Sequence, residues 1–236
     1  MPAISLVRAL RATAQSLLEL VYPPRCAACG EPVAAEPFCP VCSEALLPVP
    51  AGCARCGQPG SDDPCGPCRA APPPFDAVRA GGLFGGPLAD AIHAFKYGSR
   101  PALSRPLGAW LADQVALPPG ATIVSVPLGR ARRISRGYDQ AALLADGLAR
   151  AAGDGAQRLR GALRRTRETP PQVGQSRAER ARNVAGAFAA DRSVAGRDLV
   201  LIDDVVTTGA TAAAAAEALR SAGARSVIVI ALARAE

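Results

Sequence analysis

The sequence has few aromatic residues, one histidine, one lysine and no long apolar run. Aromatic residues make up only 4% of the chain, which leaves few rings on which nucleobases could stack. A helix that spans a membrane needs about 20 consecutive apolar residues, and no stretch meets this requirement. We therefore expect a protein without a membrane span that works in the cytoplasm.

Acidic residues are also in short supply, since 27 Lys and Arg stand against 20 Asp and Glu, for a formal charge of +7. The excess lies between Arg130 and Arg182, where 13 arginines face five acidic residues. Such a basic block favours an anionic ligand, either nucleic acid or a small phosphorylated molecule. Apolar residues make up 49% of the 236, enough for the core of one large domain or two small ones.

Residues 3–21, AISLVRALRATAQSLLELV, place apolar side chains at helical spacing, with Arg8 and Arg11 within the run. Their composition is also that of a targeting peptide, but no clear small-residue cleavage site follows. We expect residues 1–20 to form an amphipathic helix that docks on its own protein, with a targeting segment as the alternative.

All eight cysteines fall within residues 26–68, and all belong to C-x-x-C pairs. Two such pairs supply four thiolates to one tetrahedral ion, so eight cysteines predict two structural zinc sites. Disulfides or a redox motif are the alternatives, and neither suits four regularly spaced pairs without a secretion signal. The pairs are Cys26/Cys29, Cys39/Cys42, Cys53/Cys56 and Cys65/Cys68.

The cysteine region, residues 21–70, has few large apolar residues, so metal binding replaces a core, at about 10–16 kcal/mol per site. We expect sequential ligation, Cys26 to Cys42 and Cys53 to Cys68, because it closes the shortest loops; a crossed arrangement is the alternative. The region carries three arginines against five acidic residues. It is therefore better suited to a scaffold or to protein contact than to binding phosphates.

Three prolines in CRAAPPPFD mark a linker, and a second domain is expected over residues 71–236. Beyond the linker, short β-branched runs alternate with helical patterns, which predicts a mostly parallel sheet with helices on both faces. Ligands of such folds bind at the carboxyl ends of the strands. The predicted strands are 75–84, 121–127, 159–166, 186–190, 198–203 and 225–233, and the predicted helices are 87–97, 102–116, 138–152 and 209–222.

The segment LVLIDDVVTTGATAAAAAEALR, residues 199–220, combines the end of a predicted strand with the start of a predicted helix. Its loop of small residues presents backbone N–H groups at a helix N-terminus, where phosphate binds well, and Thr208 and Thr211 add hydroxyl donors. Asp203 and Asp204 would repel phosphate, but they suit hydroxyl groups or a metal ion. A ligand that carries a sugar diol close to a terminal phosphate matches both the acidic pair and the loop. An acidic pair of a phosphoacceptor domain, or an alanine-rich helix that only packs, are the alternatives.

The pattern VLIDDVVTTGAT resembles the ribose-5-phosphate signature of type I phosphoribosyltransferases. The segments IHAFKYGSR, VSVPLGRARRISRGYDQAALL and RTRETPPQVGQSRAERARNVAGAF are similar to the ComF competence-protein family. With the cysteines, this resemblance covers nearly the whole chain. It implies a type I phosphoribosyltransferase-like sheet preceded by a small double zinc-ribbon module. The chain departs from the expected pattern at Gly129 and at Tyr138-Asp139.

The resemblance implies phosphoribosyl pyrophosphate and Mg²⁺ as ligands. The 5′-phosphate would lie on the substrate-binding loop, and the ribose hydroxyls would lie on Asp203 and Asp204, the expected catalytic pair. In the charge-separated transition state the carboxylates favour the developing cation, while Mg²⁺ and basic residues hold the leaving pyrophosphate. The loop consists of Thr207, Thr208, Gly209, Ala210 and Thr211.

Basic residues for the pyrophosphate come from two loops. In the loop of residues 127–133 we expect Arg130 to make a direct contact, with Arg132 and Arg133 as further candidates. Residues 164–182 resemble a hood that closes over the site and excludes water. From this hood we expect contributions from Arg165, Gln172 and Arg177.

The single histidine and the single lysine are three residues apart in the predicted helix 87–97 and so share a face. His93 is expected to be structural. The resemblance of FKYG to the family places Lys96 and Tyr97 at the border of the site.

Three functional hypotheses follow. The first is an enzyme that transfers a phosphoribosyl group to an unknown acceptor, with a link to DNA uptake and natural transformation through the family. The second is a sugar-phosphate-binding or scaffold protein for competence or DNA-processing partners. The third is a single-stranded DNA binder, against which the low aromatic content argues, so that we expect DNA binding to be weak and steeply dependent on salt.

Overall fold

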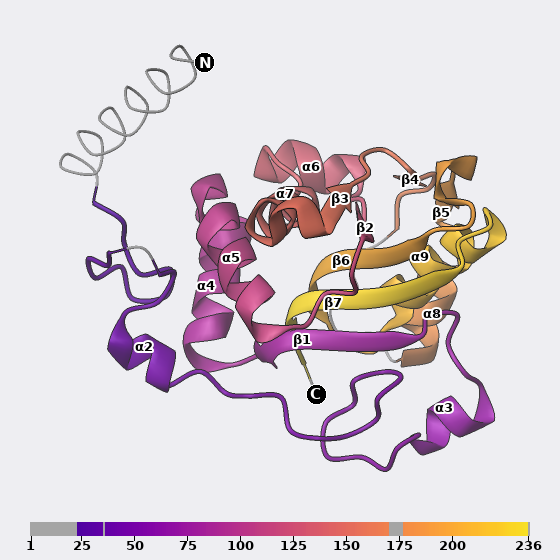
Figure 1. Cartoon of the computed structure of the whole chain (residues 1–236), viewed down its shortest axis with the longest axis horizontal. Helices are drawn as coiled ribbons and strands as arrows, with labels where there is room; N and C mark the ends of the chain where they lie inside the picture. The colour runs from indigo at the N-terminus through magenta and orange to yellow at the C-terminus, as the bar shows by residue number, and fades with distance from the viewer. Residues whose placement is uncertain (1–22, 35, 170–176, 236) are drawn as a thin grey trace.

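The computed structural model describes residues 23–34, 36–169 and 177–235 (Figure 1). The helix expected over residues 1–20 and Gln172 of the expected hood lie outside these ranges. Within them, none of the helices has the length and apolar character that crossing a membrane requires.

The centre of the molecule is a five-stranded sheet with the order β1-β7-β6-β2-β3, and every neighbouring pair is parallel. The predicted parallel α/β architecture is therefore confirmed. The apolar run Leu199–Ile202 is fully buried, as expected for a central strand that is covered on both faces. The strands are β1 (Ala77–Leu83), β2 (Ala121–Ser125), β3 (Ala156–Arg158), β6 (Asp198–Val206) and β7 (Ser226–Arg234).

Helices cover both faces of this sheet (Figure 1). Successive residues of β6 alternate between two cores: Val200 and Ile202 pack with three helices on one face, whereas Leu199 and Leu201 pack with one helix on the other. On the first face lie α4 (Gly86–Tyr97), α5 (Ser104–Gln114), which follows the 3₁₀ turn η1 (Pro101–Leu103), and α7 (Gln140–Ala152); on the second lies α9 (Ala210–Ser221).

The prediction of a single strand over residues 159–166 is wrong. The chain forms β3 in the main sheet and then β4 (Leu163–Arg165), which pairs antiparallel with β5 (Phe188–Ala190) in a separate two-stranded sheet. Between β3 and β4, Gly161 has a φ of +75°, a left-handed conformation that interrupts an extended strand. Short pieces complete the fold: η2 (Gly153–Gly155), α8 (Arg177–Val184) and η3 (Arg192–Val194).

A short helix, α6 (Arg130–Arg136), occupies a loop in which the sequence predicted no regular structure. It buries none of its residues, and Ile134 is largely exposed. The sequence therefore lacks the apolar periodicity by which a helix is predicted. The helix ends at Gly137, whose φ of +79° gives the left-handed cap typical of helix C-termini. This helix carries the arginines that the sequence assigned to a pyrophosphate loop.

The cysteine region forms two small modules that dock on different parts of the sheet domain. The first module, residues 23–34 and 36–45, contains the short helix α2 (Pro40–Glu44) and places the Phe38 ring edge-on against Trp110 of α5, with centroids 5.6 Å apart. The second module, residues 51–71, contains α3 (Gly66–Ala70). It approaches β1 so closely that a Cβ on Gly57 would lie 3.2 Å from Val78.

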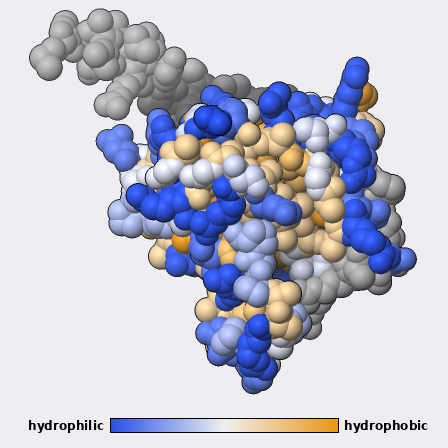
Figure 2. Space-filling model, turned by 90° about the vertical axis from the view of Figure 1, so that its right-hand side faces the viewer, coloured by the Kyte–Doolittle hydropathy of each residue, from blue (hydrophilic) through white to orange (hydrophobic). Residues whose placement is uncertain are grey.

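Figure 2 shows the side of the molecule that lies at the right of Figure 1, where weakly apolar surface lies between groups of hydrophilic side chains. The partly buried alanines of α9, such as Ala214 and Ala218, belong to the core cluster on that face of the sheet. Among the residues coloured in this view, strongly hydrophobic side chains are scattered and form no large patch.

The closest contact between helices joins α5 and α7 and depends on glycine. A Cβ on Gly147 would lie 2.1 Å from the carbonyl oxygen of Ser104, and one on Gly108 would lie 2.5 Å from the Gly147 backbone. Backbone atoms cannot rotate away as a side-chain end can. The two glycines therefore set how closely α5 and α7 pack against each other.

We predict that Gly147→Ala lowers the free energy of unfolding by about 1–3 kcal/mol, because overpacking against backbone outweighs the gain in helix propensity. The matched control is Gly155→Ala, where an added Cβ meets nothing within 4 Å. Denaturant unfolding of the zinc-loaded protein measures both. Equal stability of the two variants would contradict the assigned role of Gly147.

Candidate functional site

Asp203 and Asp204 are adjacent residues near the carboxyl end of β6, a central strand of the sheet. Asp203 lies in register with Ala231 of β7, and its Oδ1 accepts a hydrogen bond of 2.9 Å from the Asp204 backbone N–H. Both residues are partly buried. The pair thus sits at the edge of the sheet where ligands of parallel α/β folds bind.

The only lysine of the chain forms an ion pair with the second acid. Lys96 Nζ, in the last turn of α4, lies 2.8 Å from Asp204 Oδ1. The two side chains are 16% and 17% exposed, so solvent screens their attraction much less than it would on the surface. Lys96 therefore offsets part of the cost of holding two carboxylates side by side in a partly buried place.

The two acids are not equivalent. Burial and then the neighbouring Asp204 carboxylate raise the pKa of Asp203 to about 7, although the Asp204 N–H and Lys96 act in the opposite direction. Asp203 therefore titrates near neutral pH, and a bound cation or hydroxyl donor would favour its ionised form.

The loop after β6 forms a small concave turn and leads into α9. Gly209 has a φ of +77°, which the absence of a side chain permits, and α9 begins at Ala210. The N–H groups of the first turn of a helix have no intrahelical acceptors, and the helix dipole adds positive potential there. Residues 203 and 205–212 line a cavity of about 20 Å³ at this turn. The loop predicted from the sequence is therefore present, between the end of β6 and the first turn of α9.

Two further contacts hold this loop. The Ala210 N–H lies 3.4 Å from the Thr208 hydroxyl oxygen. Arg180 of α8 donates through Nη1 to the Thr207 hydroxyl oxygen at 3.0 Å. Because Arg180 lies within the expected hood, residues 164–182, it ties that segment to the loop.

A pocket of about 470 Å³ joins the acids to a basic wall, a size suited to a small-molecule ligand. Asp203 and Asp204 line it together with Thr207 and Thr211 of the loop. The pocket therefore brings carboxylates, hydroxyl groups and cationic side chains together in one place. Its basic and polar lining includes Lys96, Arg132, Arg136, Asp139, Gln140, Arg165 and Arg180.

The structure places Arg132 in the pocket wall, whereas Arg130 is exposed and does not line it. The Arg130 backbone N–H donates to the Glu168 carboxylate, which joins the start of α6 to the segment after β4. That carboxylate would lie 2.6 Å from a Cβ on Gly129. The glycine at this position thus leaves room for Glu168 where the family pattern led us to expect a bulkier side chain.

Arg136, one turn after Arg132 in α6, reaches the same pocket. Its guanidinium carbon lies 4.8 Å from the centre of the Tyr97 ring, and its Nη2 donates to the Tyr97 hydroxyl at 3.2 Å. Tyr97 is 69% exposed, so the stacked pair forms the rim of the pocket. Sequence reasoning named Tyr97 as a border residue but missed Arg136; its i, i+4 spacing from Arg132 was the available signal.

Asp139 and Tyr138, where the sequence departs from the family pattern, have structural partners. Asp139 caps α7 by accepting from the Ala142 N–H at 3.0 Å, and its second oxygen accepts from the Leu128 N–H at 2.8 Å. The Tyr138 hydroxyl donates to the carbonyl of Phe95 in α4. These contacts hold the loop after β2 between α4 and α7.

Two predicted basic residues belong to the hood. Arg165 lines the pocket, and its guanidinium carbon lies 5.3 Å from the Phe188 ring centre. Arg132 lines the same pocket, and burial, and then the positive charge of Arg132, lower the pKa of Arg165. The Arg177 side chain lies outside the described part of the chain, and its role stays a prediction.

His93 lies outside the pocket lining, on the exposed side of α4. Its ring centre is 5.8 Å from that of Phe84 and 6.2 Å from that of Tyr97. These ring contacts suit the structural role expected from the sequence.

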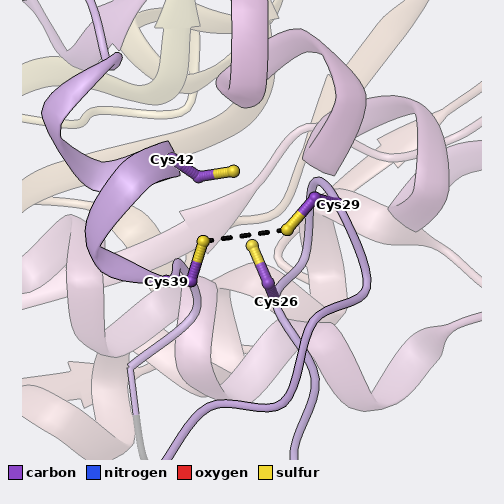
Figure 3. A group of neighbouring side chains, drawn as sticks. All are labelled: Cys26, Cys29, Cys39 and Cys42. Carbon is purple, nitrogen blue, oxygen red and sulfur yellow. Dashed lines mark hydrogen bonds between the residues drawn. The ribbon is translucent and has the colours of Figure 1, made fainter.

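The eight cysteines form two sequential tetrads, Cys26/Cys29/Cys39/Cys42 and Cys53/Cys56/Cys65/Cys68. Within each, the sulfur atoms lie within 4.8 Å of one another, and Figure 3 shows those of the first tetrad pointing toward a common centre. The Cys29–Cys39 and Cys56–Cys65 sulfurs are 3.7 and 3.6 Å apart. A tetrahedron with Zn–S bonds of about 2.3 Å has edges of about 3.8 Å, so both tetrads fit Zn²⁺.

Burial would raise the pKa of the Cys26 thiol. Hydrogen bonds from backbone N–H groups around the sulfur, first that of Cys29, outweigh the effect of burial and lower the pKa to about 6. Cys53 shows the same balance in the second tetrad and also has a pKa lowered to about 6. Metal ligands must be thiolates, so these tetrads are suited to a cation.

Comparison with known proteins agrees with this arrangement. Residues 17–72 match the double zinc ribbon domain, and residues 138–236 match the phosphoribosyl transferase domain. The chain is 36% identical over 178 residues to the DNA utilization protein YhgH of Escherichia coli K12, covering 72% of this chain and 78% of that protein. It is 30% identical over 222 residues to Competence protein F of Haemophilus influenzae, covering 89% and 90%.

The chain belongs to the ComF family. This ComF protein carries a double zinc ribbon ahead of a phosphoribosyltransferase-type domain. Among solved structures, glutamine phosphoribosylpyrophosphate amidotransferase from B. subtilis matches with 25% identity and a TM-score of 0.40, covering 59% of this chain and 30% of that one.

The raised pKa of Asp203 predicts a pH-dependent stability difference. An acid whose pKa is raised in the folded state destabilises that state increasingly as the pH rises through the folded value, here about 7. Asp203→Asn removes this penalty and keeps an oxygen for the Asp204 N–H. We expect the variant to be more stable than the parent at both pH values, and its gain at pH 8 to exceed that at pH 6 by about 1 kcal/mol, because the penalty grows by roughly one pKa unit over this range.

Asp198→Asn is the control of opposite sign, because hydrogen bonds from Arg225 and then Ser226 lower the pKa of Asp198. Its contribution is complete above the unfolded pKa and is lost only in acid, so this variant should be less stable by the same amount at pH 6 and pH 8. Denaturant unfolding at both pH values measures the two effects. A gain for Asp203→Asn that does not grow with pH would contradict the raised pKa.

Proposed function

We propose that this ComF protein binds phosphoribosyl pyrophosphate with Mg²⁺ and transfers the phosphoribosyl group to an acceptor. The single observation that carries the proposal is one pocket that joins the Asp203/Asp204 pair, the anion-binding loop and a basic wall. A pentose with a phosphate at one end, a diol in the middle and a pyrophosphate at the other end has chemistry that matches these three parts.

The loop of residues 207–211 would hold the 5′-phosphate through its backbone N–H groups and the Thr208 and Thr211 hydroxyls. Asp203 and Asp204 would accept hydrogen bonds from the ribose hydroxyls. A pKa of about 7 lets Asp203 bind a hydroxyl donor or a cation by changing its own protonation at little cost near neutral pH.

The residues of the pocket also fit Mg²⁺, because this ion is held in proteins by one or two carboxylates together with substrate phosphates. Asp203 and Asp204 are the candidate carboxylates. When bound, Mg²⁺ neutralises charge on the leaving pyrophosphate. Lys96 lies beside Asp204 and lines the same pocket, so it would contact the anionic end of the substrate.

Cleavage at the anomeric carbon separates a cationic sugar from an anionic leaving group. The carboxylates would stabilise the first, and Arg132 and Arg165, which line the same pocket, would stabilise the second. Since these side chains are already in place, little reorganisation is needed during the reaction. Arg130 and Arg177 remain proposed contributors from the sequence.

A second candidate function is a sugar-phosphate-binding or scaffold protein for DNA-processing partners. The names of the relatives, DNA utilization protein and competence protein, favour a role connected with DNA uptake. We also propose a cytoplasmic location, where free thiols that bind zinc are kept reduced. The proposed organisation is a helix over residues 1–20, a zinc-ribbon module over 21–70 and the phosphoribosyltransferase-like domain over 71–236.

We predict that Asp203→Asn combined with Asp204→Asn abolishes binding of phosphoribosyl pyrophosphate with Mg²⁺, measured by calorimetry, because the diol and the cation lose their acceptors. Zinc content should stay at two ions per chain, because the tetrads are separate from the pocket. Asp154→Asn, an exposed acid just before β3, should bind as the parent does.

Retained binding in the double variant would contradict the proposed site. Pyrophosphate release in the presence of a panel of bases, amines and DNA ends separates the two candidate functions. Transfer requires release that depends on one acceptor, whereas a binding protein would hold the ligand without release.

The positions of the two arginines give a further prediction. Arg132→Met should weaken binding of phosphoribosyl pyrophosphate by about tenfold, because it removes a charge-assisted contact from the pocket wall. Arg130→Met should change it less than about threefold, since the exposed Arg130 side chain is outside the lining. Calorimetry measures the affinity of both variants for phosphoribosyl pyrophosphate. A larger loss of affinity in Arg130→Met than in Arg132→Met would favour the direct Arg130 contact expected from the sequence.

A further inference from the structure

Arg234, the last residue of β7, is an arginine with only 4% of its surface exposed. Its guanidinium reaches in two directions. Toward the anion-binding loop, Nη1 donates to the carbonyls of Val206, at 3.1 Å, and Thr207. Toward the second cysteine module, Nε donates to the Gly57 carbonyl at 3.1 Å and Nη2 donates to Gln58 Oε1 at 2.9 Å. One side chain therefore bridges two segments that are about 150 residues apart in sequence.

The acceptors in the second module belong to the turn of residues 53–58, which carries the metal ligands Cys53 and Cys56. The Gly57 N–H donates to the Cys53 carbonyl at 2.8 Å, and the Cys53 N–H donates to the Gln58 carbonyl at 3.1 Å. Gly57 follows the ligand Cys56 directly. The positions of Gly57 and Gln58 therefore depend on the sulfur atoms being gathered around one ion.

The acceptors on the other side belong to the loop that binds the anion. Val206 and Thr207 lead into Gly209 and the first turn of α9. A charged donor that holds two consecutive carbonyls restrains the orientation of these peptide groups. It also places positive charge directly behind a loop that we expect to bind phosphate.

The second module lies against the loop in a further respect. A cavity of about 480 Å³ is lined both by Cys56 and Cys65 of the second tetrad and by Thr208 of the loop, with Arg234 in its wall. The first module packs instead on Trp110 of α5 and shares a core cluster with α4 and α5. The two zinc sites therefore have different neighbours.

We propose that Arg234 is a positioning residue that couples the second zinc site to the anion-binding loop. Zinc in the tetrad Cys53/Cys56/Cys65/Cys68 fixes Gly57 and Gln58, and Arg234 transmits this order to Val206 and Thr207. Loss of the second zinc loosens the loop, whereas loss of the first does not. The ordering of the loop is independent of the proposed function, and only its consequence for phosphoribosyl pyrophosphate rests on it.

The test compares four variants of the full-length protein by amide hydrogen exchange over residues 206–211, by zinc content and by calorimetry with phosphoribosyl pyrophosphate and Mg²⁺. Cys56→Ser and Cys29→Ser are a matched pair, since each removes the second cysteine of its own module. Arg234→Met removes the bridge while both tetrads stay intact. Arg234→Lys keeps the charge but cannot reach all acceptors as the planar guanidinium does.

We expect Arg234→Met and Cys56→Ser to speed exchange of the loop by about tenfold or more and to weaken ligand binding by a similar factor. Cys29→Ser should leave loop exchange within about twofold of the parent, although it too loses one zinc. Arg234→Lys should fall between the parent and Arg234→Met. Arg220→Met is a control for general destabilisation, because Arg220 anchors Pro74 and Asp76 near the C-terminal end of α9.

Unchanged loop exchange in both Arg234→Met and Cys56→Ser would overturn the proposal, as would an equal effect of Cys29→Ser or Arg220→Met. If Arg234→Met does not fold, the comparison of Cys56→Ser with Cys29→Ser decides by itself. Should the parent not bind phosphoribosyl pyrophosphate while loop exchange still responds as expected, the coupling stands and the proposed function fails.

Discussion

Two adjacent carboxylates at the end of a central strand are the constraint around which the site is organised. Side by side and partly buried, Asp203 and Asp204 repel each other, and burial and this repulsion raise the pKa of Asp203. Lys96 of α4, the only lysine of the chain, offsets part of this cost through its ion pair with Asp204. Arg132 and Arg136 of α6, together with Arg165 and Arg180, line the same pocket and supply the opposite charge. A folded protein keeps such an arrangement at some cost to stability, which is typical of functional sites.

The two cysteine tetrads stabilise the cysteine region. The cysteine region has too few large apolar side chains for its own core, so the sulfur clusters hold each module together. Each module then docks on the sheet domain by different means. The first uses an aromatic contact with α5, and the second uses close backbone packing on β1 and the buried guanidinium of Arg234. The ribbons are thus part of the same structure as the pocket.

The parallel sheet and its main helices could be predicted from the sequence because their signals are local. Strands such as residues 199–202 are continuous β-branched or apolar runs, and the helices on the faces have apolar periodicity. Elements without such signals were not predicted correctly. Helix α6 buries no side chain, and the run 159–166 looked like one strand, although the strand of the main sheet ends at Arg158 and only residues 163–165, beyond Gly161, form a strand of the second sheet.

The sequence by itself determined the local groupings: the spacing of the C-x-x-C pairs is enough to provide two sulfur tetrads, and a strand followed by DD, TTG and a helix is enough to place two acids beside the N-terminal turn of a helix. Only the tertiary structure decided which basic residues share the pocket. Arg132, Arg136 and Arg180 meet there and Arg130 does not, because helix phase and the packing of α6 and α8 set their directions. It also decided that Arg234 joins a zinc knuckle to the loop, since contacts between residues so distant in sequence depend on how the chain folds back on itself.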